Sequence, residues 1–556
     1  MLDLRRNGSL SIEDAKKISL IQAEVRVEYN DFVESLIATN EISDFQWLLQ
    51  ITTRNTYASW IFDSMCRLKL LECLLKEGRD ITLITIDNPS LKNPILKILE
   101  NYKNHSDVNI VRINRNKSFQ VSRNLVKNVY VCLCLWIGSF LYKANINLNG
   151  EVYFLDSFIL KKSFDKNQNF KDRYYPSLIS NLPNDVKDKV WYLSTLSGIK
   201  YPMDWIKIFS HVSRSKNNIL LKEYWLNFKD YLFAIWKSIW LPKTIKIIPK
   251  WGNLDISEIV LDEIKNDQAS NSITQGILMY LFFKRLKKDQ VEIKGIINWF
   301  ENQIIDRGLY LGMNEFFPKV YIKGYLGFIP EDYYLGIFPT EYEKKYNLIP
   351  HELLVVGEAY IDKIRQYCPD LKVVVAPAFR FKHVFEFKQN PALTRNNILL
   401  ALPMNIEEVR NIIKLLSKVK LDRKSKLVIK VHPASNNENI MELISKLTNI
   451  NYEIIDRPLT DIFQSTRLLI TTASSVALEA IACGINVAVI GNRSGPTIER
   501  LSGYAEKEYW SISYSSLELE NMILKEHVKV KIDVIKYFQP INKKDTLKML
   551  LFESNE

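Results

Sequence analysis

The stretch from Lys426 to Gly491 constrains the fold of this chain most. It holds two short apolar runs, KLVIKV at 426–431 and RLLIT at 467–471, and the helical pattern VALEAIACG follows the second. Short apolar runs that end in turn-forming or polar residues are typical of buried strands. Strands that alternate with helices predict a parallel sheet, with ligands outside the carboxyl ends of the strands. His432 and the pair Ser474 and Ser475 are expected at this ligand edge, with Pro433 and Thr472 beside them as further donor-binding candidates.

Two series of such strands predict two large α/β domains. The chain has 556 residues, which is too long for one hydrophobic core. Strand-like runs of the first series begin at 81, 108, 151, 190, 294, 320, 334 and 353, and a helical, aromatic-rich insertion occupies about 200–290. KVVVAPAFRF at 372–381 is expected to open the second series. We therefore expect an N-terminal domain at 1–365, a C-terminal domain at 366–505 and a polar helical tail at 506–556.

The charge balance favours anionic partners. Lys and Arg exceed Asp and Glu by 75 − 63 = 12, and the pI is near 9.0. Nucleotide phosphates, nucleic acid and an anionic membrane surface all fit this excess, but no nucleic-acid-binding motif is present, so nucleic acid is not an expected partner. The six cysteines form no metal-like pairs, and the N-terminus has no apolar signal segment. Both features predict a cytoplasmic protein.

Two segments leave membrane contact open. The longest apolar run, Val129 to Tyr142, is shorter than the roughly 18–20 residues that a spanning helix needs. A buried helix is the favoured interpretation, with shallow insertion as the alternative. In Tyr224 to Lys250 aromatic residues alternate with lysines, which fits an interfacial helix or a core helix with an outer lysine face. Peripheral contact with the inner face of the cytoplasmic membrane therefore remains an expectation.

The HP dipeptide at His432 and the SS dipeptide at Ser474 carry a family resemblance. In their order and spacing the chain resembles bacterial GT-B glycosyltransferases, including sialyltransferases and Kdo transferases. The stretches WFENQIIDRG, VYIKGYLGF and VVAPAFRF also resemble a bacterial family of surface carbohydrate biosynthesis proteins. The resemblance implies an α/β GT-B fold, with two Rossmann-like domains facing across a cleft. It also implies a CMP-linked sugar as co-substrate, with no other cofactor.

The resemblance assigns the donor side of the site to the second domain. It implies that His432 and the two serines hold the CMP phosphate and cytidine, while Pro433 fixes the turn. Glu479 lies four residues after Ser475, on the same helix face, where it can accept from ribose hydroxyls. Arg380 can pair with a phosphate or with the carboxylate of a ulosonic acid. The structural alternatives are a helix cap for Ser474 and a surface ion pair for Arg380.

The first domain must supply the catalytic carboxylate. The acidic pair followed by Gly that sialyltransferases use is absent from any strand end, so no catalytic residue can be carried over. Glu301 is the first candidate, because the apolar residues before it raise a carboxylate's pKa toward the useful range. Asp156 is the second, at an expected strand tip, and His432 is a donor to the leaving phosphate. The acceptor-side candidates are Asn302, Gln303, Asp306 (more simply a helix cap) and Tyr325.

These residues predict a metal-independent glycosyltransferase of bacterial surface-polysaccharide assembly, for capsule, O-antigen or lipooligosaccharide. The expected donor is a CMP-linked ulosonic or nonulosonic acid, and the acceptor is a glycan or a lipid-linked glycan. No P-loop, HExxH, GxSxG or DxD signature supports another chemistry. The alternatives are a CDP-glycerol-type glycerophosphotransferase, another GT-B transferase, or a non-catalytic GT-B-like subunit of glycan assembly.

Overall fold

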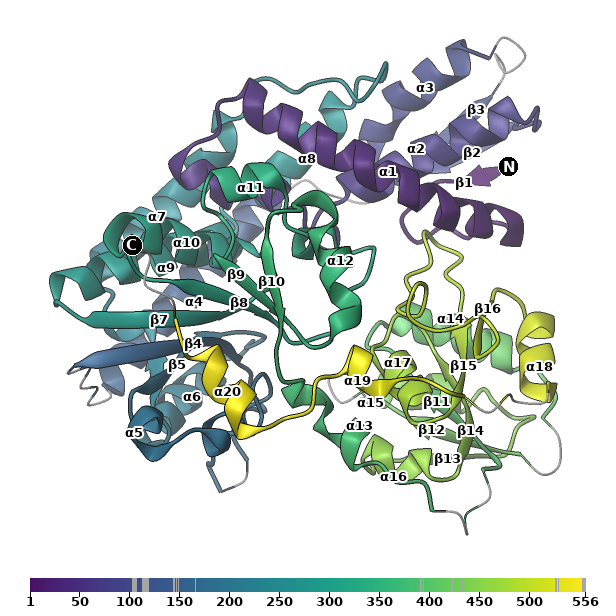
Figure 1. The fold of residues 1–556 in the computed structure, drawn as a ribbon. Helices are drawn as coiled ribbons and strands as arrows, with labels where there is room; N and C mark the ends of the chain where they lie inside the picture. The colour runs from purple at the N-terminus through teal and green to yellow at the C-terminus, as the bar shows by residue number, and fades with distance from the viewer. Residues whose placement is uncertain are drawn as a thin grey trace.

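The molecule has three parts, each built on a parallel sheet (Figure 1). The computed structural model describes residues 1–552 except 103–107, 113–119, 144–145, 147, 149, 166, 391–392, 394, 422–424, 433–434, 436, 526–527 and 529. A small N-terminal unit lies above the second of two larger α/β domains, and the last segment of the chain runs back to the first. All three sheets are parallel, so helices cross over between their strands.

The first domain contains a seven-stranded parallel sheet in the order β10-β9-β8-β7-β4-β5-β6. Counted along the chain from β4, this is the Rossmann order 3-2-1-4-5-6 with one further strand at the edge. The central strands β8 and β9 are buried throughout, as expected where helices cover both faces. The strands are β4 (Glu151–Ile159), β5 (Val190–Leu196), β6 (Ile219–Leu221), β7 (Glu292–Trp299), β8 (Ile322–Leu326), β9 (Glu352–Val355) and β10 (Lys372–Val375).

The second domain repeats this plan with six parallel strands in the order β13-β12-β11-β14-β15-β16. Counted from β11, the order is again 3-2-1-4-5-6, so the expected pair of Rossmann-like domains is confirmed. The strands are β11 (Asn397–Ala401), β12 (Lys426–Lys430), β13 (Tyr452–Ile455), β14 (Thr466–Thr471), β15 (Asn486–Ile490) and β16 (Trp510–Ser513).

Helices connect the strands and cover the sheets. Those of the first domain are α4 (Gln120–Leu141), α5 (Asn184–Lys187), α6 (Pro202–Arg214), α7 (Phe228–Trp240), α8 (Ser257–Asp267), α9 (Asn271–Lys288), α10 (Ile304–Phe316), α11 (Glu341–Lys345) and α12 (Ile361–Ile364). Those that follow are α13 (Lys382–Glu386), α14 (Ile406–Leu416), α15 (Asn437–Ile444), α16 (Leu459–Phe463), α17 (Val476–Ala482), α18 (Ser516–Leu524), α19 (Val534–Tyr537) and α20 (Lys543–Met549).

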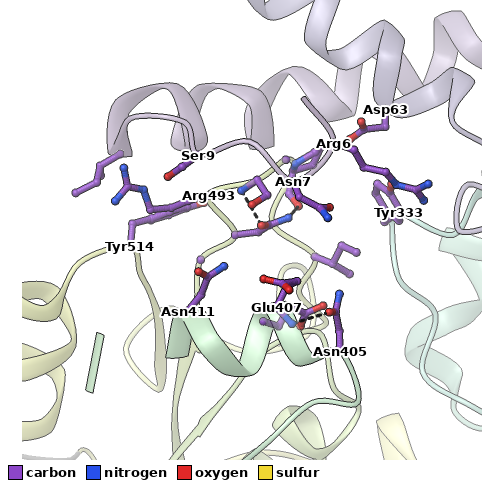
Figure 2. Close-up of a pocket in the computed structure, with 18 of the residues that line it drawn as sticks. Arg6, Asn7, Ser9, Asp63, Tyr333, Asn405, Glu407, Asn411, Arg493 and Tyr514 are labelled. Atoms are coloured by element: carbon purple, nitrogen blue, oxygen red, sulfur yellow. Dashed lines mark hydrogen bonds between the residues drawn. The ribbon is translucent and has the colours of Figure 1, made fainter. Parts of the chain in front are cut away.

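The N-terminal unit forms a sheet of its own, which the strand pattern did not separate from the first domain. Its strands β1 (Leu2–Asp3), β2 (Leu83–Ile86) and β3 (Asn109–Arg112) pair in that order. The expected cap of its first helix is present, since Ser11 Oγ accepts from Asp14 N at 3.0 Å. The first loop lies opposite α14 of the second domain (Figure 2). The helices of the unit are α1 (Ile12–Thr39), α2 (Ile61–Lys76) and α3 (Lys92–Glu100).

Three sequence-based expectations need correction. Lys372–Val375 pairs with β9, so it is the edge strand of the first sheet and does not open the second series after 365. Trp510–Ser513 pairs with β15, so the expected helical tail begins with the last strand of the second sheet. The segment 334–343 contains a 3-10 turn, Leu335–Ile337, and the start of α11 in place of a strand. In each case long-range pairing decides the outcome.

The end of the chain returns to the first domain. Gln539 bonds to the segments that follow β9 and β10. Its N–H donates to Val356 O at 2.7 Å, and its carbonyl accepts from Ala378 N at 2.9 Å. Beyond α20, the Nζ of Lys323 donates to Leu551 O at 2.8 Å, and the ring of Phe552 stacks on Tyr153 with centroids 5.8 Å apart. The segment therefore fastens the second domain to the first sheet.

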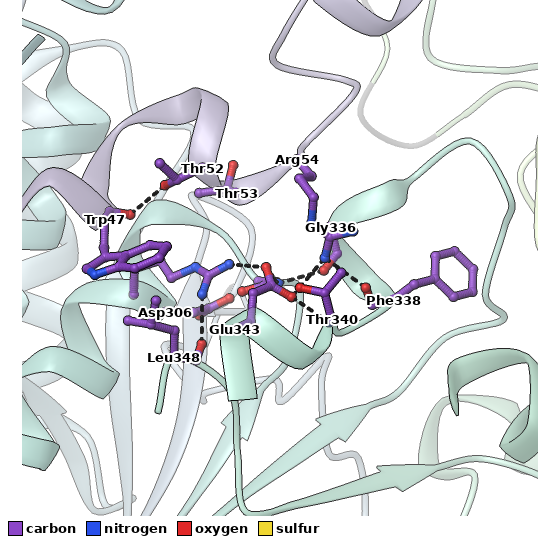
Figure 3. A network of polar contacts seen from close by, with 12 residues as sticks. Trp47, Thr52, Thr53, Arg54, Asp306, Gly336, Phe338, Thr340, Glu343 and Leu348 are labelled. Carbon is purple, nitrogen blue, oxygen red and sulfur yellow. Dashed lines mark hydrogen bonds and ion pairs between the residues drawn. The ribbon is translucent and has the colours of Figure 1, made fainter. Parts of the chain in front are cut away.

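A buried ion network joins the N-terminal unit to the first domain (Figure 3). Glu343 of α11 pairs with Arg54 at 2.8 Å and with Arg307 of α10, and all three side chains are buried. Burial acts to raise the pKa of Glu343, but the charges of Arg54 and Arg307 outweigh it and hold the pKa below its usual value. The stabilisation is therefore present above the ordinary glutamate pKa and is lost as the pH falls through the lowered one.

Replacing Glu343 tests this network. In Glu343→Gln two guanidinium groups stay buried without a counter-charge, so we expect the free energy of unfolding to fall by about 3–5 kcal/mol. Glu341→Gln is the matched control on the same helix, at an exposed position, and should change it by less than about 0.5 kcal/mol. Urea unfolding followed by circular dichroism measures both, and equal stabilities would contradict the role given to the network.

Candidate functional site

Each large sheet has one point where the strand order reverses. In the first sheet this point lies between β7 and β4, and in the second it lies between β11 and β14. Open α/β sheets bind ligands outside the carboxyl ends of the strands at such a point. The segment that leaves β7 contains Glu301, and the segment that leaves β14 contains Ser474 and Ser475. Both expected halves of the site therefore lie where a ligand edge is expected.

Asp156 is a buried structural acid and does not lie at a strand tip, because β4 continues to Ile159. Its Oδ2 accepts from Asn298 Nδ2 at 2.7 Å and from Trp299 N at 3.2 Å. Burial raises its pKa well above the ordinary value, and the neighbouring Asp306 adds to the rise. Asp156 therefore holds the carboxyl end of β7 from inside the protein core.

Asp306 closes the first turn of α10. Its Oδ2 accepts from Gln303 N at 2.9 Å, and its Oδ1 accepts from Asn298 Nδ2 at 3.1 Å. Burial raises its pKa to about 7. Asp306 is therefore the helix cap that was weighed from the sequence, and its burial keeps it away from an acceptor.

Glu301 is the carboxylate of this group that solvent reaches. Its Oε1 accepts from the indole Nε1 of Trp299 at 2.8 Å, and its Oε2 accepts from the Gln303 side chain. Burial of part of the side chain raises its pKa, while these two bonds and the charge of Arg380 oppose the rise. A carboxylate with a raised pKa that still meets solvent has the properties of a general base.

Asn302 and Tyr325 do not lie on an acceptor side. Asn302 is buried with φ 54°, and its Nδ2 donates to Gly336 O at 2.7 Å and to Glu343 at 3.1 Å. Tyr325 is also buried, and its hydroxyl donates to Pro377 O at 2.8 Å. Asparagine tolerates the left-handed region better than most residues. Asn302 therefore holds the backbone next to Glu301, and Tyr325 holds the connector that leaves β10.

Arg380 joins the two halves of the site. It lies in the turn Phe379–Phe381 that leaves the first sheet, and not at the tip of a second-domain strand. Its guanidinium carbon lies 5.6 Å from the centroid of the Trp299 ring. Nearby protein lowers its pKa by reducing hydration, and the charge of Glu479 opposes this effect. Arg380 thus lies near Glu301 of one domain and Glu479 of the other.

On the second domain, Glu479 connects the SS dipeptide to a histidine. The Ser475 hydroxyl donates to Glu479 Oε1 at 3.0 Å, as the i+4 spacing predicts. The other oxygen, Oε2, lies 2.8 Å from His383 Nε2. Ser474 Oγ accepts from Val476 N at 3.3 Å, and Ser474 N donates to Thr472 O at 2.7 Å. His383 has no motif around it, and sequence analysis missed it.

His432 follows β12 at the same edge, exposed to solvent. Reduced hydration lowers its pKa, and the positive charges of Arg173 and Lys162 add to this effect. Both cations come from the loop that leaves β4 of the first domain. His432 therefore faces an excess of positive charge from the first domain. Pro433 lies outside the residues that the structure describes.

A cavity of about 460 Å³ lies between the N-terminal unit and the second domain (Figure 2). Arg6, Trp60 and Arg67 line it from the unit, and α14 and the loop 491–496 line it from the domain. A cavity of about 50 Å³ adjoins it and reaches Thr472 at the end of β14. Sequence analysis missed this cavity, because its first wall comes from residues 6–67.

Arginines and a glutamate line opposite walls of the cavity. Arg67 is buried, and its Nη1 has no hydrogen-bond partner among the described residues. The guanidinium of Arg6 lies over the Trp60 ring, 4.0 Å from its centroid. On the opposite wall burial raises the pKa of Glu408, against a hydrogen bond from Thr472. An unpaired buried donor of this kind is costly unless a ligand or water accepts from it.

Comparisons with known proteins leave the fold assignment to the strand order. No protein-family model matches the sequence, and no curated protein matches it. Among solved structures, the lipopolysaccharide outer core galactosyltransferase WaaB aligns with 72% of this chain and 100% of its own, at 12% identity and a TM-score of 0.39. The UDP-GlcNAc 2-epimerase of Methanocaldococcus jannaschii covers 71% and 98%, at 11% identity and a TM-score of 0.41. The calicheamicin glycosyltransferase CalG4 covers 72% and 93%, at 9% identity and a TM-score of 0.38. Likeness at this level carries no argument about activity.

Substitution of Asp156 separates a structural acid from a catalytic one. Asp156→Asn keeps an acceptor for Trp299 N–H, so we expect a small effect at low pH, where the aspartate is protonated, whereas Asp156→Ala should cost about 1–3 kcal/mol for the lost acceptor alone. Because the folded pKa lies above 3.8, the folded state holds a proton that the unfolded chain releases. Wild-type stability should therefore fall relative to Asp156→Asn as the pH rises through that window. Urea unfolding of both proteins, measured from about pH 4, the free aspartate pKa, upward, gives the free energy of unfolding against pH. Parallel curves for the wild type and Asp156→Asn would contradict the prediction.

Proposed function

We propose that this chain is a glycosyltransferase that moves a sugar from a nucleotide-activated donor to a hydroxyl group of a glycan. The observation that carries the proposal is the placement of Glu301. This solvent-reachable carboxylate with a raised pKa lies beside Arg380, which also lies near Glu479 of the second domain. A base on one domain opposite oxyanion-binding groups on the other is what such a transfer needs.

The cations of the site support a role on the leaving phosphate. Arg380 belongs to the turn between the sheets, and Arg173 and Lys162 lie close enough to His432 to lower its pKa. Negative charge develops on the phosphate oxygen as the sugar–oxygen bond breaks, and fixed cations stabilise it. In this proposal the acceptor hydroxyl gives its proton to Glu301, and His432 and Arg380 bind the departing nucleotide without a metal.

The loop after β14 supports a donor position. Thr472 lines the small cavity. Ser475 of the same loop donates to Glu479, the carboxylate that lies near Arg380. A donor that lies across this loop has its nucleoside in the cavity and its sugar toward Glu301. The unpaired Nη1 of Arg67 then offers a hydrogen-bond donor to an oxygen of the nucleotide.

The proposed donor is a CMP-linked ulosonic or nonulosonic acid, and the acceptor is a growing surface glycan in the cytoplasm, free or lipid-linked. Support comes from the HP and SS dipeptides and from Arg380, whose fork can pair with the sugar's carboxylate. A UDP-sugar or CDP-glycerol transferase uses the same two-domain plan. A subunit of glycan assembly without catalysis is the remaining alternative.

Loss of the Glu301 charge should remove the base. We expect Glu301→Gln to lower kcat by roughly 10²- to 10⁴-fold, with a smaller change in the donor KM. The wild-type rate should rise with pH through a pKa above the ordinary 4.5 of a glutamate, because only the ionised form accepts the proton. Glu315→Gln, on α10 away from this edge, is the matched control. Steady-state assays measure these values, and a fully active Glu301→Gln would overturn the assignment.

A panel of donors tests the substrate. We expect product only with CMP-linked ulosonic or nonulosonic acids, at a rate unchanged by EDTA, when CMP-, CDP-, UDP- and GDP-linked compounds are offered with a glycan acceptor. Release of the free nucleotide and mass spectrometry of the glycan report turnover. Turnover with UDP-sugars or CDP-glycerol alone would replace the donor and keep the transferase. Glycan binding without turnover of any donor would favour the assembly subunit.

A further inference from the structure

An unusual apolar stripe runs along the outer face of α4. Val126, Leu133, Ile137 and Phe140 lie three to seven residues apart, on one side of the helix, and are 71%, 42%, 41% and 77% exposed. From Asn128 to Leu141 the helix has no charged residue. A stripe of this kind on a helix of a soluble domain normally faces the core. Here the opposite side of α4 packs inward, and the stripe meets solvent.

Helix α7 carries a second stripe with more aromatic residues. Phe228, Leu232, Trp236 and Trp240 follow at intervals of four, which places them on one side of the helix. Leu232, Trp236 and Trp240 are each 52% exposed. The inner side of this helix is buried through Tyr231, Ala234 and Ser238.

The two helices lie side by side and antiparallel. Asn128 Nδ2 of α4 lies 3.4 Å from Ser238 Oγ near the end of α7, and the ring of Trp136 lies 5.2 Å from that of Phe228 near its start. Trp136 also stacks on Phe140, with centroids 6.3 Å apart. The stripes therefore join into one surface, which we call the α4–α7 face.

Lysines of the segment from Phe228 to Lys250 border this face, while Asp44 and Glu315 lie beside Lys237 at one end of it. Lys237 lies 5.4 Å from the Trp236 ring centroid, and Lys243 lies 4.4 Å from that of Trp240. The segment from Phe228 to Lys250 holds five lysines and one carboxylate, Asp230, which is buried and bonded to Arg285 at 2.9 Å. Helix α4 has no carboxylate at all. An exposed apolar centre with a cationic border complements an anionic lipid surface.

Helix α4 lies on the domain and is held there. By length and composition it is the one helix among the described residues that qualifies as a membrane span, with 28% of its apolar window buried. Its buried Asn128 donates to Thr274 Oγ1 of α9 at 2.7 Å. A Cβ on Gly138 would come within 2.3 Å of the Phe209 ring, so α4 packs tightly on α6. Spanning would break these contacts, whereas docking uses only the exposed side.

We propose that the α4–α7 face docks the protein on the surface of an anionic lipid bilayer. Phe140, Trp236 and Trp240 insert among the headgroups, and the surrounding lysines pair with lipid phosphates. Aromatic rings with a polar edge favour the headgroup layer, and lysine stems reach past apolar contacts to charged groups. This inference does not depend on the proposed transfer, because lipid binding needs no turnover.

Vesicle sedimentation of the full chain tests the proposal. We expect binding to vesicles of phosphatidylcholine with phosphatidylglycerol, weak binding to phosphatidylcholine alone, and loss of affinity at high salt. The triple variant Phe140→Ser, Trp236→Ser, Trp240→Ser should bind at least about tenfold more weakly. The variant Lys229→Gln, Lys243→Gln, Lys246→Gln should lose roughly fivefold for each lysine at low salt.

The matched control carries three substitutions of apolar residues elsewhere that are at least as exposed as those of the face. Leu20→Ser, Leu517→Ser and Ile535→Ser change residues that are 77%, 68% and 59% exposed, and they should leave vesicle binding unchanged. Circular dichroism checks that each variant is folded. Undiminished binding of both face variants overturns the proposal, as does binding that ignores lipid charge. Self-association that the aromatic variant abolishes, without vesicle binding, assigns the face to a second copy of the chain and also overturns it.

Discussion

The geometry of the site depends on one buried carboxylate. Glu343 neutralises Arg54 of the N-terminal unit and Arg307 of α10, and it also accepts from Asn302. Removal of three charged groups from water is expensive, and only close mutual pairing offsets that cost. The bond to Asn302 holds a residue with φ 54° directly after Glu301. A long-range ion network therefore fixes the backbone that presents the candidate base, and the N-terminal unit takes part in it.

Environment divides three nearby carboxylates between different roles. Asp156 and Asp306 share the Asn298 amide below the end of β7, and burial raises the pKa of each. A raised pKa favours the neutral form, which costs less to bury than the charged form. Glu301 lies one layer further out, where the Trp299 indole and the charge of Arg380 counteract its burial. The same chemical group thus serves as scaffold or as reagent according to how far it lies from water.

Much of the fold was predictable from local patterns, and little of the site was. Apolar runs identified most strands of both sheets, because burial on two faces leaves a continuous apolar stretch. The place of Lys372–Val375 in the first sheet was not predictable, since its parallel pairing with β9 depends on residues outside the strand itself. The spacing of Ser475 and Glu479 predicted their contact, but His383 reaches that helix from the connector between the sheets. The wall contributed by Arg6 and Arg67 exists only through tertiary packing.

The returning tail limits how the two large domains can move. The outgoing connection and the tail lie side by side, joined through Ala378 and Gln539, so both covalent links pass through one narrow region. Rotation about that region is the motion that strains neither link. At the far end the N-terminal unit grips the loop after β15, where Arg493 bonds to Leu10 O and Arg67 to Ser494 O. An opening rotation would have to break these bonds as well as the ion pair of Arg500 with Glu331 at 2.5 Å, so the wall of the cavity also helps to hold the domains closed.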